Sequence, residues 1–144
     1  MNFFKKKDTK LNKDEKNLVL ICGLFVHAAR MDENYTSNEK LIILKALSKI
    51  SDKDEADIKA ILEKAEKKES DSNQILEFTR EVKNYEKNFR LKIIEVLWKI
   101  IYSDGVSDMY ESNLMRRLAK LLYVSDKESG EIKQLVIKNI IWPM

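Results

Sequence analysis

Apolar residues recur along this chain at helical spacing, and the pattern predicts helices throughout, with no credible set of strands. The predicted helices cover residues 13–31, 36–50, 54–68, 73–83, 85–103, 109–123 and 125–139. Two of them, around Leu18 to Val26 and Leu91 to Ile101, are apolar on nearly every side, which is typical of buried central helices. We therefore predict an all-α fold, a compact bundle of about seven helices.

Helix-start signals and composition agree with this pattern. Thr36-x-x-Glu39 and Ser125-x-x-Glu128 each have the spacing of a capping box, in which the two side chains satisfy free backbone amides at a helix start. Only three glycines and one proline interrupt 144 residues, which favours long helices. At 44% hydrophobic content the chain can bury a core as one domain.

The two halves of the chain resemble each other when the sequence is shifted by 72 residues. Asp32 then falls on Asp104, Glu39 falls on Glu111, and the apolar positions of the two central helices coincide. Each half consists of a buried helix, an acidic loop and an amphipathic helix. We expect two units related by a pseudo-twofold axis, with the equivalent central helices packed together.

Charge divides the chain into two predicted parts. Residues 1–16 hold six lysines and three acidic residues, which accounts for the whole net charge of +3, so the remainder is neutral. We expect residues 1–12 to be a flexible basic tail and residues 13–142 to be the helical domain. A neutral body argues against a nucleic-acid partner. The tail, with Phe3 and Phe4, is expected to make at most weak contact with an anionic membrane surface.

Candidate chemistry is sparse. Cys22 is the only cysteine and lies in an apolar run, so we expect it in the core of a protein from a reducing compartment. His27 is the only histidine and is expected on the solvated side of its helix. No signal peptide, membrane span, phosphate-binding loop or nucleophile motif is evident. These observations predict a soluble, cytoplasmic protein that is not an enzyme.

The repeated motif carries a resemblance to a known family. Ala28-Ala29-Arg30-Met31-Asp32 with Glu39, and Tyr102-Ser103-Asp104-Gly105 with Glu111, are similar to the TerB tellurite-resistance family over roughly residues 15–140. Glu33 departs from the family pattern, which usually has glycine there. The resemblance implies a compact seven-helix fold and a link to stress or tellurite-resistance systems. It also implies divalent-cation binding at the acidic positions.

The acidic positions admit two interpretations. Glu39 and Glu111 each stand third after a capping residue and can simply cap helices. Asp32 and Asp104 follow helix C-termini, where the helix dipole disfavours a carboxylate by roughly 0.3–1 kcal/mol, so they serve either as loop-forming Asx turns or as functional groups. If Asp32, Glu39, Asp104 and Glu111 bind a cation, their oxygen atoms suit calcium or magnesium.

Two function hypotheses follow. The first is a non-enzymatic TerB-like module that binds a divalent cation through these four carboxylates. The alternative is a protein-interaction or scaffolding module whose acidic loops are purely structural. In both cases we expect another protein as the partner.

Overall fold

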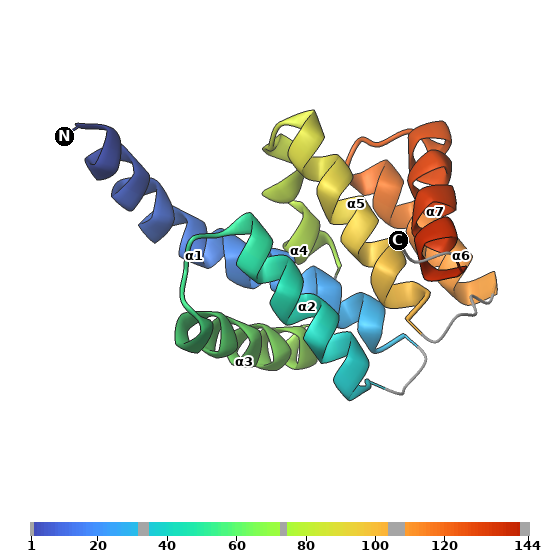
Figure 1. The fold of residues 1–144 in the computed structure, drawn as a ribbon, viewed down its shortest axis with the longest axis horizontal. Coiled ribbons are helices and arrows are strands. Elements are labelled where there is room, and N and C mark those ends of the chain that lie inside the picture. The colour runs from blue at the N-terminus through green and yellow to red at the C-terminus, as the bar shows by residue number, and fades with distance from the viewer. Residues whose placement is uncertain (1, 32–34, 73–74, 104–108, 142–144) are drawn as a thin grey trace.

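The computed structural model describes residues 2–31, 35–72, 75–103 and 109–141 of the chain. Within these ranges, side chains are described for residues 15–31, 35–72, 75–103 and 112–139. The regular elements of this part are all helical (Figure 1). They are α1 (Asn2–Ala29), α2 (Ser37–Ile50), α3 (Glu55–Asp71), α4 (Leu76–Thr79), the 3₁₀ helix η1 (Val82–Asn84), α5 (Lys87–Ile101), α6 (Met109–Leu121) and α7 (Asp126–Ile141). The predicted all-α class is confirmed.

The core forms around α1 and α5, which contact each other. α1 also packs against α2, α3 and α4, whereas α5 also packs against α2, α6 and α7. Both runs that the sequence marks as central are buried: Leu24 and Phe25 on α1 and Ile94 and Leu97 on α5 are completely inaccessible to solvent. The prediction of two buried central helices is therefore confirmed, and the derivation of the two halves from one unit stays a prediction.

The start of α1 differs from the expected boundary, since the helix begins at Asn2 rather than near residue 13. No glycine or proline lies between residues 2 and 22, so nothing in the sequence ends the helix before the core is reached. Figure 1 shows the first turns of α1 projecting away from the rest of the molecule. The division into a flexible tail of residues 1–12 and a domain of residues 13–142 stays a prediction.

The helix predicted at residues 73–83 is broken into α4 and η1. Ile75 at the start of α4 provides no side-chain cap, and the hydroxyl of buried Thr79 donates back to the carbonyl oxygen of Leu76 at 3.4 Å. Such a bond competes with regular helix geometry. The short element places Phe78, which is 1% exposed, directly against Gly23 of α1.

Candidate functional site

The four predicted cation ligands are only partly within the described structure. Asp32 and Asp104 lie outside the described residues. Glu111 belongs to α6, but its side chain is also outside the described part. Among the residues that the structure does describe, no three His, Cys, Asp or Glu side chains gather closely enough to hold a metal ion. The four-carboxylate site stays a prediction.

Glu39 is the one predicted ligand whose side chain is described, and it caps α2. Its Oε1 accepts a hydrogen bond from the backbone N–H of Thr36 at 2.8 Å and another from the Thr36 hydroxyl at 3.1 Å. In return, the backbone N–H of Glu39 donates to Thr36 Oγ1 at 3.1 Å. Glu39 as a whole residue is only 5% exposed, so these bonds compensate the burial of its carboxylate. The predicted capping box is confirmed.

The second predicted capping box is confirmed as well. Glu128 Oε1 accepts from the Ser125 hydroxyl at 3.0 Å, and the backbone N–H of Glu128 donates to Ser125 Oγ at 3.0 Å. Lys87 approaches the other carboxylate oxygen of Glu128 at 2.7 Å. The hydrogen bonds from Lys87 and Ser125 lower the pKa of Glu128.

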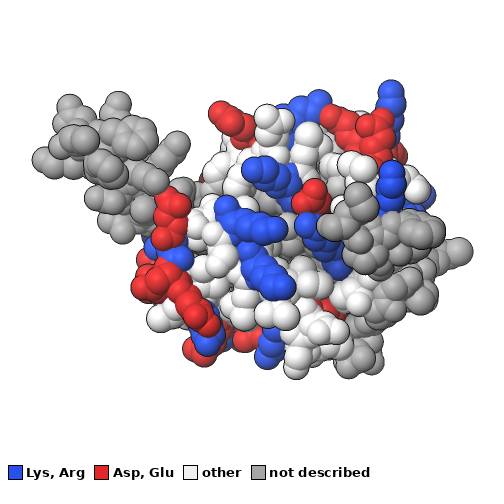
Figure 2. Space-filling model, viewed as in Figure 1, with Lys and Arg blue, Asp and Glu red and all other residues white. Residues whose placement is uncertain are grey.

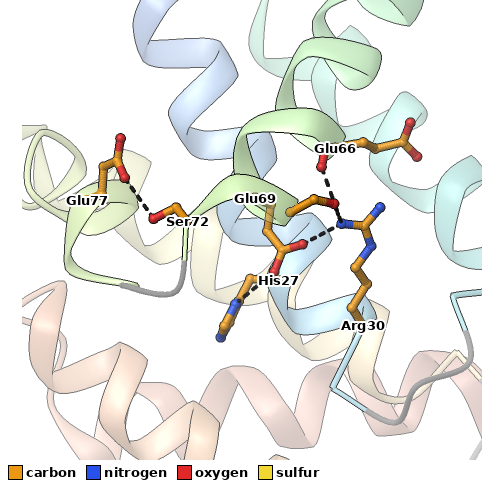
Figure 3. A network of polar contacts seen from close by, with 7 residues as sticks. His27, Arg30, Glu66, Glu69, Ser72 and Glu77 are labelled. Atoms are coloured by element: carbon orange, nitrogen blue, oxygen red, sulfur yellow. Dashed lines mark hydrogen bonds and ion pairs between the residues drawn. The ribbon is translucent and has the colours of Figure 1, made fainter.

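A polar network joins the end of α1 to the end of α3, and the sequence did not reveal it (Figure 3). Arg30 Nη1 donates to Glu69 Oε1 at 2.5 Å and to Ser70 Oγ at 2.7 Å. His27 Nδ1 lies 3.2 Å from Glu69 Oε2, so one carboxylate holds both His27 of α1 and Arg30, which follows the last residue of α1. His27, expected to be solvated, is instead half-buried in this network. The contacts exist because α3 continues to Asp71, beyond the predicted helix end at residue 68.

Tyr35 continues this network toward α2. Two cations lie over its ring, the Arg30 guanidinium 5.3 Å and the Lys40 ammonium 5.0 Å from the ring centroid. Lys40 Nζ also lies 3.4 Å from Glu66 Oε2 on α3. Burial raises the pKa of the Tyr35 hydroxyl, and the neighbouring Glu66 carboxylate raises it further. Lys40 thus connects α2 with α3 beside the Tyr35 ring.

A different feature, an open groove, lies between α2 and α5. Its cavity measures about 300 Å³. The floor is apolar, since Ala46 of α2 and Val96 of α5 are buried and Ile42 and Ile50 of α2 are half-buried. The rim is charged and consists of Lys45, Lys49, Lys92, Glu95 and Lys99.

The rim carries a surplus of positive charge. Four lysines face one glutamate, and that glutamate is paired, since Glu95 Oε2 lies 3.2 Å from Lys99 Nζ one turn further along α5. Such an exposed pair contributes at most about 1 kcal/mol. Figure 2 shows basic side chains gathered over α2 and α5 on the face in view. The groove therefore offers an apolar surface framed by cations.

A second concavity, of about 540 Å³, lies between α6 and the start of α7. Arg116, Arg117 and Lys120 line it together with Ser125 and Asp126. These three cations are exposed, and the first turn of α7 already carries the acidic residues Asp126 and Glu128. Val124 is the one apolar side chain among its described lining residues, whereas four apolar side chains form the floor of the α2–α5 groove.

The fold and the α2–α5 groove define the class of protein. It is a compact helical domain built around two buried helices, with a lysine-rimmed groove between α2 and α5. None of the described helices combines the length and apolar character needed to cross a membrane. The family model described as tellurite resistance protein TerB matches residues 8–134, which is most of the chain. The chain belongs to the TerB family, as the sequence motifs indicated. Comparisons with curated proteins and with solved structures give no significant match.

Proposed function

We propose that this TerB-family chain is a non-enzymatic module, associated with tellurite resistance, that acts by binding another protein in the α2–α5 groove. The observation that carries the proposal is the groove itself, in which an apolar floor of buried and half-buried side chains lies beneath a cationic rim. Apolar concave surfaces with a few charged groups at the edge are typical of sites that recognise a ligand or a partner.

The surroundings of the reactive side chains support binding rather than catalysis. Burial raises the pKa of the Cys22 thiol far above its ordinary value of 9.0, and the Glu66 carboxylate adds to this, so the thiol stays protonated and unreactive. His27 is held by Glu69, and Glu39 is engaged in its cap. The buried free thiol also agrees with a reducing compartment, and we place the chain in the cytoplasm.

Site-specific photo-crosslinking tests the proposal. A photoreactive amino acid at Lys49, on the groove rim, should give a covalent adduct with one partner protein in cells exposed to tellurite. The matched control places the same amino acid at Lys59, which is exposed on α3 and outside the groove. Equal adducts at both positions, or none at Lys49, would refute a binding role for the groove.

Cation binding through Asp32, Glu39, Asp104 and Glu111 is our second candidate function, and it rests on the repeated spacing of these acids in the sequence. Calorimetric titration of the chain with calcium, magnesium and manganese tests it, with Asp104→Asn as the variant that should lose the binding heat. The Glu39→Ala variant adds a distinction, because it removes the acceptor of the Thr36 N–H and hydroxyl and so lowers stability, by roughly 0.5–1.5 kcal/mol for each hydrogen bond lost, whether or not a cation is present. Absence of heat with all three ions would refute this candidate.

A further inference from the structure

The floor of the α2–α5 groove is a stripe of apolar side chains that recur at helical spacing along α2. Ile42, Ala46 and Ile50 follow one another four residues apart on α2, and Val96 faces them from α5. Ile50 lies eight positions after Ile42, which corresponds to about 12 Å along the helix axis, or about two helical turns. Two neighbouring helices that expose such a stripe leave room for a third helix to pack its own apolar residues into it, at the spacing i, i+3, i+4 and i+7.

The rim specifies the charge of whatever lies in the groove. Lys45 and Lys49 stand on the α2 side, and Lys92 and Lys99 stand on the α5 side. Of these, Lys45, Lys49 and Lys92 have no ion-pair partner among the described residues. Like charges gathered around a small concavity repel one another, and acidic side chains placed between them would relieve that repulsion. The aliphatic stems of the lysines would at the same time extend the apolar wall.

Other occupants suit the groove less well. A second copy of the chain, docked symmetrically through the same face, would set lysines against lysines. The described residues that line the groove include no arginine and no aromatic side chain, the residues on which nucleic acids are bound and stacked. A membrane surface is also a poor fit, because the apolar residues are recessed between two helices rather than projecting from them.

We propose that the α2–α5 groove binds an acidic amphipathic helix of a partner protein. The apolar side of that helix lies on Ile42, Ala46, Ile50 and Val96, and its Glu or Asp side chains pair with the lysines of both walls. This inference rests on the proposed function and adds to it the chemical class of the partner. The charge of the lysines gives specificity for an acidic partner helix, while the apolar floor supplies the contact area.

The test uses the full chain and two designed peptides of matched length, each with leucines at i, i+3, i+4 and i+7. One peptide carries glutamates beside the leucine stripe, and its twin carries lysines there. Binding is measured by fluorescence anisotropy. We expect the glutamate peptide to bind, the affinity to fall as salt is added, and the lysine twin not to bind.

Two charge-matched double variants locate the binding. Lys49→Glu with Lys92→Glu reverses one charge on each wall of the groove, and we expect the affinity to fall about tenfold or more. Lys67→Glu with Lys138→Glu makes the same change in net charge on exposed positions of α3 and α7 and should leave the affinity unchanged. Circular dichroism establishes that all variants remain folded.

Several outcomes would overturn the inference. These are equal binding of the two peptides, equal loss of affinity in the two double variants, or binding of phosphatidylglycerol vesicles or a single-stranded oligonucleotide in place of the glutamate peptide. Sedimentation that showed a dimer disrupted by Lys49→Glu would have the same consequence. A partner crosslinked at Lys49 through a segment that is neither acidic nor helical would refute the inference alone. Absence of any groove-specific adduct would refute the proposed function itself.

Discussion

Gly23 offers a test of how closely α4 packs against α1. A Cβ atom added at this position would lie 2.4 Å from Cε1 and 2.6 Å from Cδ1 of the Phe78 ring. Carbon atoms in contact normally stay about 3.5–4.0 Å apart, so more than an ångström of overlap would have to be relieved. The ring is 1% exposed and surrounded by core residues, which prevents it from turning into solvent.

Two opposing contributions decide the effect of Gly23→Ala. Replacing glycine by alanine inside a helix stabilises the helix by about 0.8–1.0 kcal/mol. Overpacking a filled core costs about 1–3 kcal/mol, and an overlap of this size against a buried ring belongs at the upper end. We therefore expect a net destabilisation of about 1–2 kcal/mol, which in a chain of this length lowers the Tm by roughly 3–8 °C.

Gly130 is the matched control, because it also lies within a helix, α7, but an added Cβ would meet no atom within 4 Å. Gly130→Ala should therefore raise the free energy of unfolding by about 1 kcal/mol. Both variants are measured by urea and thermal unfolding, followed by circular dichroism. If Gly23→Ala stabilises the protein as much as Gly130→Ala does, the contact with Phe78 is refuted. If the contact is real, Gly23→Ala combined with Phe78→Leu should cost less than the sum of the single changes.

Three further changes have definite signs. Tyr123 has a φ of 58°, so Tyr123→Gly should raise the free energy of unfolding by about 1 kcal/mol in urea titrations, whereas a loss would show that the ring contributes more than the strain costs. Ser129→Ala removes the acceptor at 3.1 Å from the buried Trp98 indole N–H and should cost about 1–3 kcal/mol by the same measurement. Burial raises the pKa of the Cys22 thiol above 9.0 in the folded protein. The stability that the protonated thiol contributes is therefore complete below about pH 9 and is lost as the pH rises toward the folded pKa. The free energy of unfolding should fall between about pH 9 and pH 10, and less so in Cys22→Ala.

Features set by neighbouring residues could be predicted from the sequence. The two capping boxes at Thr36 and Ser125 depend on residues three positions apart, and both are present as expected. The burial of α1 and α5 follows from apolar residues on nearly every side of each helix. These predictions succeeded because the physical cause and its effect lie within one turn or one helix.

Features that depend on pairing distant segments could not be predicted in the same way. The His27 and Arg30 contacts with Glu69 join residues about 40 positions apart, and no local pattern specifies that pairing. Only one wall of the groove can be recognised in the sequence, because Lys92, Glu95 and Lys99 recur at helical spacing on α5. The other wall depends on the packing of α2 beside that helix. The break between α4 and η1 lies where the Thr79 hydroxyl bonds back to the Leu76 carbonyl oxygen and where Phe78 packs against Gly23, a contact between distant segments.

α2 carries a residue of each candidate function, and their separation allows the two to be distinguished. Glu39 lies in its first turn and Lys49 in its last, ten residues apart, which corresponds to about 15 Å along the helix axis. At physiological salt, interactions between charges more than about 8 Å apart are largely screened, so reversing the charge at the exposed Lys49 leaves the electrostatics at Glu39 nearly unchanged. Glu39→Ala should therefore lower the unfolding free energy without altering affinity for the glutamate peptide. Lys49→Glu should weaken that affinity and lower stability only by the roughly 1 kcal/mol expected when a cation in the last turn of a helix is replaced by a carboxylate. If Glu39→Ala changed the affinity, or Lys49→Glu cost clearly more than this, the cap and the groove would be coupled through α2, contrary to this separation.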